Sequence, residues 1–203
     1  MNPTFLTALA VCAGVLGGAL ILVEDRRLSL GLLAGMYLTA ALLAALAQPV
    51  LLAAARLGAG LMAVAILWVT LNSLGWAQPR ARGPGALPSG LAFRAITVLL
   101  VLIAAVGLSL RPAGALQSVP VERALGAMLL IAMGLLHLGI SEEPFRIGAG
   151  LLTALAGFEL AYSALEPSLA VGALLASVHL GLALVVSYVL AAVEGPVPED
   201  HAR

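Results

Sequence analysis

The sequence predicts an all-α integral membrane protein with seven transmembrane helices, and three observations support that prediction. Hydrophobic residues make up 62% of the 203 residues, and charged residues make up only 10%. The mean hydropathy is +1.11, more than the polar surface of a soluble domain of this size could offset. Seven apolar stretches follow one another, each long enough at about 20 residues to cross a hydrocarbon core of about 30 Å.

The charge distribution excludes several functional classes. The formal net charge is zero, because ten acidic residues balance ten basic residues, and all ten basic residues are arginine. A polybasic patch is absent, so no nucleic-acid partner is expected. Seven spans use most of the chain, which leaves no room for a separate catalytic domain outside the membrane. The composition therefore points to the lipid bilayer as the surroundings of most residues.

Short polar turns divide the first part of the chain. The first turn is the charged run 24–27. The second contains Pro49, and proline opens a helix readily because its missing N–H would be unpaired at that position anyway. Residues 1–76 are therefore expected to form an N-terminal three-helix unit, with spans at about residues 5–23, 28–47 and 50–74.

Arg56 lies inside the third expected span, about two turns from its outer end. The interpretation that the sequence favours is a side chain that extends its charged head to the membrane interface. The alternative is an ion pair with an acid on a neighbouring helix. Near the other end of the span, Trp76 is suited to the aromatic belt of a membrane interface.

A segment rich in proline and glycine separates the two halves of the chain. Residues 77–90 favour an exposed loop over a helix for this reason. We expect residues 77–122 to form this loop plus a linking helix, residues 123–193 to form a C-terminal three-helix unit, and residues 194–203 to form a polar tail. The last four spans are expected at about residues 91–110, 124–140, 147–165 and 168–193.

The two three-helix units share a pattern of turns. Each has an acidic-then-basic turn after its first span, at residues 24–27 and 142–146. Each also has a polar residue followed by proline after its second span, at residues 48–49 and 166–167. Three helices, a linking helix and three more helices would give both units the same orientation. The sequence thus predicts two parallel three-helix repeats joined by a linking helix.

The arginines predict how the chain is oriented. Short cytoplasmic loops carry an excess of basic residues. We therefore expect a multi-pass protein of the cell's inner (cytoplasmic) membrane, with its N-terminus outside and its C-terminus in the cytoplasm. The richer face carries Arg26, Arg27, Arg80, Arg82, Arg146 and Arg203, with Arg94 nearby, and the other face carries Arg111 and Arg123, with Arg56 nearby.

Glu159 is an acidic residue in the middle of an apolar span. An ionised Glu at bilayer depth costs about 3 kcal/mol on insertion scales and more than about 10 kcal/mol in simulations, so such a residue is a candidate functional site. It lies about 13 residues beyond Arg146, or roughly 20 Å along a helix. Two interpretations stay open, a proton-binding group or a protonated side chain that only joins two helices.

Four further side chains are candidates for a proton path with Glu159. His179 lies near the middle of the seventh span, within about 10 Å of the depth of Glu159. Ser177 and Tyr162 supply hydroxyl groups, and His137 lies close to the expected cytoplasmic end of the fifth span. Each has a plainer interpretation, because a lone histidine on an apolar helix often bonds a backbone carbonyl and a buried tyrosine often only packs. Two histidines and one Glu on three helices show no ligand spacing for a metal.

Short motifs in the C-terminal unit resemble a known family. Residues 157–160, Gly-Phe-Glu-Leu, residues 181–184, Gly-Leu-Ala-Leu, and the turn that ends at Arg146 resemble the three-helix K subunit of proton-pumping NADH-quinone oxidoreductase. The seven-span length and residues 26–29, Arg-Arg-Leu-Ser, are more similar to component E of hydrogenase-4 and formate hydrogenlyase. The resemblance implies that Glu159 matches a buried Glu of the K subunit.

The chain also departs from the K subunit at two places. The resemblance puts Ser177 about where that subunit has a second buried Glu, with His179 two residues further on. The position of the N-terminal unit that matches Glu159 is apolar. The resemblance therefore implies a structural N-terminal unit and a C-terminal unit that carries the proton chemistry.

The resemblance implies a membrane-arm subunit of a complex I-like or hydrogenase-4-like complex that couples redox energy to proton translocation. Such a subunit would hold no redox cofactor and no metal, would not be catalytic alone, and would bind other antiporter-like membrane subunits. Two alternatives stay open: a small-solute transporter, since some sugar carriers use parallel three-helix repeats, and a structural scaffold subunit without ion conduction. A transporter needs a polar pocket at mid-depth, and the middles of the spans hold almost no Asn, Gln or Trp.

Overall fold

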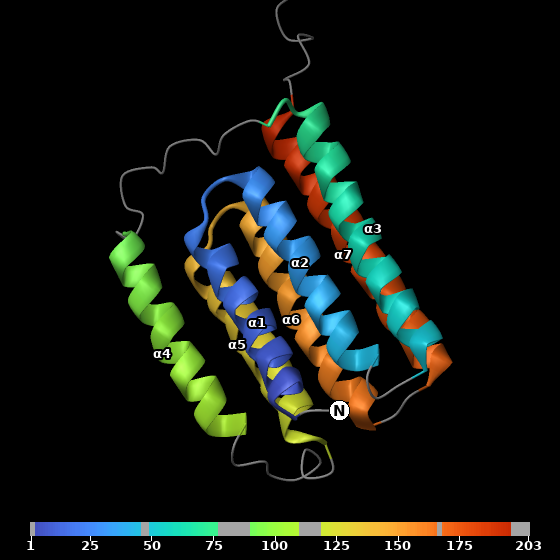
Figure 1. The fold of residues 1–203 in the computed structure, drawn as a ribbon. Coiled ribbons are helices and arrows are strands. Elements are labelled where there is room, and N and C mark those ends of the chain that lie inside the picture. The colour runs from blue at the N-terminus through green and yellow to red at the C-terminus, as the bar shows by residue number, and fades with distance from the viewer. Residues whose placement is uncertain (1–2, 46–48, 77–89, 110–118, 166–167, 196–203) are drawn as a thin grey trace, which may run out of the picture.

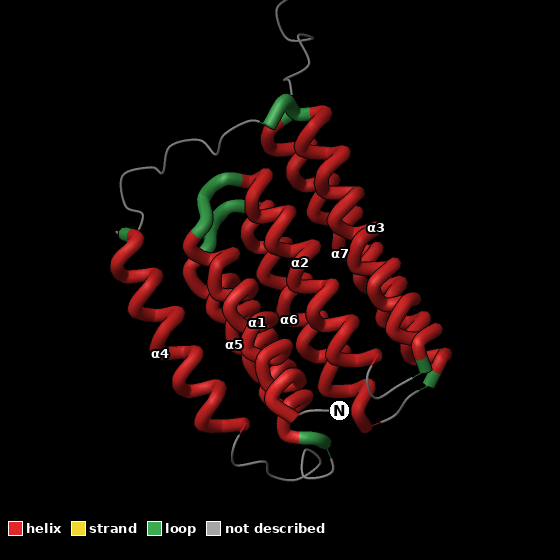
Figure 2. The backbone as a smooth tube through the Cα atoms, viewed as in Figure 1, coloured by secondary structure: helices red, strands yellow, loops and turns green. Residues whose placement is uncertain are grey.

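The computed structural model describes residues 3–45, 49–76, 90–109, 119–165 and 168–195. Within these ranges every regular element is an α-helix, and no strand occurs (Figure 2). Each helix is long and apolar enough to cross a membrane, which confirms the predicted fold class. The helices are α1 (Pro3–Leu22), α2 (Arg26–Ala45), α3 (Val50–Ser73), α4 (Leu91–Ser109), α5 (Val121–Ile140), α6 (Pro144–Leu165) and α7 (Leu169–Glu194).

Three helices begin earlier than the sequence predicted and extend into the expected polar turns, α5 among them with its start at Val121. α2 begins at Arg26 because the Asp25 carboxylate accepts a hydrogen bond of 2.8 Å from the backbone N–H of Arg27, which is how a helix N-terminus is capped. α6 begins at Pro144, a residue type favoured at the first position of a helix. Residues 77–89 of the expected loop at 77–90, and residues 196–203 of the expected tail at 194–203, lie outside the described residues.

Helices α1, α2, α5 and α6 form the centre of the bundle (Figure 1). α4 packs on the outer side of α5, whereas α3 and α7 lie side by side on the opposite flank and run in the same direction. In each three-helix unit the first helix packs on the second and the second on the third, and the two first helices and the two third helices contact each other. This order of neighbours is compatible with a parallel duplication, which stays a prediction.

Glycines bring α5 and α6 together backbone to backbone. A Cβ atom added at Gly134 would contact the backbone of Ala154, and one added at Gly157 would lie 2.7 Å from the backbone nitrogen of Ile131. Gly157 therefore turns toward α5. Glu159 is two residues further on, about 200° around the helix, and so points away from α5 toward α3 and α7. The packing of α6 on α5 thus fixes the direction of this carboxylate.

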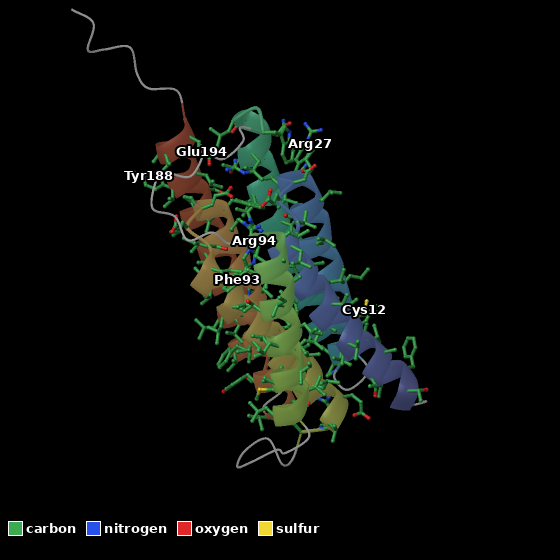
Figure 3. The ribbon with its side chains drawn as sticks, turned by 90° about the vertical axis from the view of Figure 1, so that its left-hand side faces the viewer. Cys12, Arg27, Phe93, Arg94, Tyr188 and Glu194 are labelled. Carbon is green, nitrogen blue, oxygen red and sulfur yellow. The ribbon has the colours of Figure 1, made fainter. Side chains whose placement is uncertain are left out.

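Ion pairs join the helix ends where α2 begins and α7 ends. The Arg26 guanidinium donates two hydrogen bonds of 2.7 Å to the two carboxylate oxygens of Glu194 and one of 2.8 Å to Glu143. Arg94 of α4 lies 3.0 Å from the carboxylate of Glu24. Figure 3 labels Arg27, Arg94 and Glu194 on this side of the molecule. We call the set Arg26, Glu143 and Glu194 the end cluster.

Candidate functional site

Glu159 lies inside the helix bundle, and not at its lipid-facing surface. The residue is 6% exposed, although its α6 neighbour Phe158 is 49% exposed. It is six residues before the end of α6, or about 9 Å along the helix axis. The carboxylate faces side chains from α2, α3 and α7, so it is shielded from hydrocarbon by protein. This is the placement that intramembrane acids with a function usually have.

Arg56 of α3 is the closest charged partner of Glu159. Its Nε atom lies 2.9 Å from Glu159 Oε1, within salt-bridge distance, although the N–H is not aligned on the oxygen well enough for a hydrogen bond. The Arg56 side chain is only 10% exposed. The structure therefore corrects the interpretation that the sequence favoured for Arg56. The side chain pairs with an acid on a neighbouring helix because α3 lies close enough for the pair to form.

His179 of α7 lies on the other side of the same carboxylate. Its Nε2 atom is 3.9 Å from Glu159 Oε2, and the residue is 1% exposed. Its Nδ1 atom is 2.9 Å from the backbone oxygen of Leu175. A carbonyl only accepts hydrogen bonds, so Nδ1 carries a hydrogen. In the neutral ring the lone pair is then on Nε2, the nitrogen nearer to the carboxylate.

Tyr37 of α2 completes the group, and sequence reasoning missed it. Its ring meets the His179 ring edge to face, with centroids 5.7 Å apart. Its hydroxyl donates a long hydrogen bond of 3.5 Å to the backbone oxygen of Leu152. The ring fits against α3 because Gly60 has no side chain, and a Cβ atom there would collide with it. A phenol in the middle of an apolar span was the signal that could have revealed it.

A small cavity adjoins the carboxylate. Its volume is about 20 Å³, which is room for about one water molecule. Polar atoms of Glu159 and Arg56 are available to bind such a water. The lining residues are Tyr37, Ala40, Ala41, Ala44, Arg56, Ala156, Glu159 and Leu160.

The structure turns one of the predicted hydroxyl groups, that of Ser177, away from Glu159. Ser177 is exposed, and its hydroxyl donates to the backbone oxygen of Ala173 in its own helix. It is two residues before His179, so the two side chains leave α7 on nearly opposite sides. Tyr162 stacks on Phe158, with ring centroids 6.0 Å apart. Their part in a proton path stays a prediction.

His137 is buried but far from Glu159. It is 2% exposed, and within the described part of the chain neither ring nitrogen has a hydrogen-bond partner. Its Cβ atom lies opposite Gly150 of α6. Gly150 is nine residues before Glu159, or about 14 Å along the helix. Direct proton transfer between His137 and Glu159 is excluded at that separation.

The groups around Glu159 fit proton exchange better than metal binding. Among the residues that the structure describes, no group of three or more His, Cys, Asp or Glu side chains could hold a metal ion. The Arg56 guanidinium occupies one side of the carboxylate and would repel a metal cation.

No protein-family model, curated protein or solved structure matches the chain.

Proposed function

We propose that this chain is a membrane-arm subunit of a redox-driven proton-translocating complex, of the complex I-like or hydrogenase-4-like kind. In this proposal Glu159 binds and releases the translocated proton. One observation supports it above the others: the carboxylate is held inside the bundle between a fixed cation, Arg56, and a titratable base, His179. The resemblance of the C-terminal unit to the K subunit points to the same residue.

Glu159 and His179 can pass one proton between them. The O–H bond at Oε2 of the protonated Glu159 breaks and an N–H bond forms at Nε2 of His179, which leaves a carboxylate and an imidazolium. The two atoms are 3.9 Å apart and must approach to about 2.8 Å. A side-chain rotation brings them that close, or a water in the adjoining cavity bridges them.

Arg56 links this proton to events outside the chain. An ionised Glu159 balances the Arg56 charge 2.9 Å away, whereas a protonated Glu159 leaves that charge without its carboxylate counter-ion. A change in charge near Arg56, or a movement of its side chain, therefore changes how readily Glu159 binds a proton. A partner subunit that moves charge during electron transfer would drive proton uptake and release in this way.

The arrangement also explains why the proposal is a subunit and not an autonomous pump. A pump needs a protonation step with access to each side and a source of energy. Within the described ranges, all acidic residues other than Glu159 lie at helix ends or turns: Glu24, Asp25, Glu122, Glu142, Glu143 and Glu194. We therefore propose that antiporter-like membrane partners in an inner-membrane complex supply the rest of the path and the redox energy.

The test is the substitution Glu159→Gln in the intact complex. Glutamine keeps the size of the side chain but cannot exchange a proton at this position. We expect redox-driven proton uptake into inside-out membrane vesicles to fall by about 100-fold or more, as general acid–base groups contribute about 10²–10⁴-fold to proton transfer steps. NADH and formate serve as electron donors in parallel assays, with quinone reduction or hydrogen release as the measure of electron transfer.

The matched control is Glu142→Gln, since Glu142 is an exposed acid in the α5–α6 turn. This variant should translocate protons as the unchanged chain does. Full translocation by Glu159→Gln would show that the assignment of Glu159 is wrong. A lack of redox-driven uptake with both donors, or purification of the chain as a small autonomous oligomer, would show that the redox-complex proposal is wrong.

A structural scaffold is the second candidate, because Arg56 and Glu159 join α3 to α6 directly. The double substitution Arg56→Met with Glu159→Leu separates it from the proposal. Replacing a buried ion pair by apolar residues of similar volume is often neutral or stabilising. A scaffold so changed should keep full proton translocation, whereas the proposed proton site should assemble and fail to translocate. A small-solute carrier is less compatible with the cavity at Glu159, whose volume of about 20 Å³ is too small for a sugar.

A further inference from the structure

The buried side of α2 changes character at Tyr37. Toward the start of the helix, Leu30, Leu33 and Met36 are buried. Toward its end, the buried positions that line the cavity at Glu159 are alanines: Ala40, Ala41 and Ala44. The same helix therefore packs large side chains before Tyr37 and presents small ones to the cavity at Glu159 after it, although Leu43 is also buried beyond Tyr37.

Large side chains close the bundle between Tyr37 and the end cluster. Leu33, Met36 and Leu152 are fully buried, and they pack with residues of α3 and α7 such as Leu67 and Leu190. Close-packed apolar side chains leave no room for water. Beyond them, the three hydrogen bonds of Arg26 tie the start of α2 to Glu143 and Glu194. Within the described residues, the polar side chains buried on this side of Tyr37 include Thr153 and Ser187, so closure toward this end depends on the apolar side chains around them.

On the other side of Tyr37, Glu159 lies closer to the end of the bundle. Glu159 is about 9 Å of helix from the end of α6, but about 22 Å from its start at Pro144. Over that shorter distance the α2 side chains that face it are alanines, and Arg56 lies at the margin with 10% of its side chain exposed. The charged groups of Arg56 and Glu159 line this space and would hold water there.

We propose that water and protons reach Glu159 from one side only, through a slot along Ala40, Ala41 and Ala44 that opens at the end where α2 finishes. Tyr37 forms the inner wall of the slot, held by Gly60 and the His179 ring. Passage toward the end cluster requires His179 and Tyr37 to move, or a partner subunit to provide the second half of the path. The inference rests on the proposed function of Glu159 and adds the side from which its proton comes.

Cysteine substitution tests this access in the full chain within its complex. The native Cys12 is exposed on α1 (Figure 3) and is first replaced by serine. Single changes Ala44→Cys and Ala41→Cys then report on the slot. The silver ion is the probe, because it is small and water-soluble and reacts with the thiolate that forms only where water reaches. Later labelling with a maleimide measures how much thiol has remained.

The matched controls are Ala149→Cys and Ala183→Cys, on the side of Tyr37 nearer to the end cluster. The native alanines at these two positions are 1% and 0% exposed. Two markers identify the side of addition. Val50→Cys lies at the slot end at the start of α3, and Glu142→Cys lies at the opposite end in the α5–α6 turn. Vesicles of both orientations are used, so that silver is added to one side at a time.

We expect Ala44→Cys and Ala41→Cys to react at least about tenfold faster than the two control cysteines, with silver on the side that modifies Val50→Cys. Equal rates for all four cysteines, or faster reaction from the side of Glu142→Cys, would overturn the one-sided slot. The labelling rates test the slot, whereas the Glu159→Gln variant tests the proton function, so the two proposals can fail separately. Reaction from the wrong side with an inactive Glu159→Gln would overturn only the slot, whereas the expected pattern with a fully active Glu159→Gln would overturn only the proton function.

Discussion

The molecule contains two buried arginine–glutamate clusters that differ in the geometry of their contacts. In the end cluster, Arg26 is 6% exposed and donates three hydrogen bonds to two carboxylates, one of them bound through both of its oxygens. At the candidate site, Arg56 Nε lies 2.9 Å from Glu159 Oε1, and this contact is not a hydrogen bond. The first arrangement has the two-pronged geometry of a strong charge-assisted pair.

The difference suggests different roles for the two clusters. A pair with all its strong hydrogen bonds made resists rearrangement, and the end cluster joins the start of α2 to the α5–α6 turn and the end of α7. At the candidate site, the contact between Arg56 Nε and Glu159 Oε1 has no such hydrogen bond. Glu159 has His179 at 3.9 Å on its other side, and in the described residues Nε2 of that histidine has no hydrogen bond. We therefore expect changes to the end cluster to affect stability and changes at Glu159 to affect proton transfer.

The largest expected effect on stability is that of Arg26→Ala. The substitution leaves Glu143 and Glu194 facing each other without their cation, and their side chains are only 17% and 14% exposed. Removing one partner of a buried ion pair costs about 3–5 kcal/mol, and the partial exposure of these acids puts the expected loss near the lower value. The midpoint of thermal unfolding in a mild detergent, compared with that of the unchanged chain, measures the loss.

A second measurement on Arg26→Ala tests whether the end cluster has a role in proton transfer. Proton translocation per electron, measured in the fraction of complex that remains assembled, should be unchanged. An unfolding midpoint equal to that of the unchanged chain would mean that the end cluster contributes little. A lower proton-to-electron ratio at normal stability would contradict the assignment of the two roles.

Gly60→Ala should have a smaller effect, at the site itself. The added methyl group collides with the Tyr37 ring, and overfilling a packed interior costs about 1–3 kcal/mol. Gly58→Ala is the matched control on the same helix, because nothing lies within 4 Å of a Cβ atom there. It should be neutral or gain up to about 1 kcal/mol from the better helix propensity of alanine. The measurement is the difference between the unfolding midpoints of the two variants, and equal midpoints would show that Tyr37 is not held by Gly60.

The spans were predictable from the sequence because each depends on local composition. Apolar runs of about 20 residues, with charge or proline between them, predict membrane helices without knowledge of the neighbours. Glu159 was predictable for the same reason, since an acid in such a run is rare. The boundaries at Arg26 and Pro144 differed by a few residues, because a capping carboxylate and a first-turn proline extend a helix into its turn.

The partners of Glu159 were not predictable from the sequence, because they depend on how helices rotate and pack. Arg56 is 103 residues away in the chain, and it reaches Glu159 because α3 packs on α2 and α7, which both contact α6. The Tyr37 ring fits at the site because Gly60 has no side chain that would collide with it. Ser177 shows the opposite case, since a two-residue shift on α7 turns its hydroxyl away from the site. The N-terminal unit, expected to be structural, thus supplies Arg56 and Tyr37.

The smallest expected effect is that of Arg27→Ala, next to the end cluster but exposed. Its guanidinium lies 4.6 Å from the centre of the Trp76 ring. Trp76 follows α3 with φ of 56°, in the left-handed region that is costly for a residue with a side chain. An exposed cation–π contact contributes about 0.5–1 kcal/mol, which offsets part of that cost. Removing it should loosen Trp76 and lower the unfolding midpoint far less than Arg26→Ala does.

Tryptophan fluorescence measures this change directly, because the chain has two tryptophans. A Trp68→Phe background leaves Trp76 as the reporter, since the two rings are in contact at 6.4 Å. Arg27→Ala in that background should shift the emission to longer wavelength, as the indole becomes more accessible to water, and Arg27→Lys should shift it less because an ammonium group keeps part of the cation–π attraction. The contradicting result is that Arg27→Ala lowers the unfolding midpoint as much as Arg26→Ala does. In that case the three hydrogen bonds of Arg26 would not account for its larger expected contribution to stability. The contrast between a satisfied end cluster and a responsive Glu159 site would then lose its physical basis.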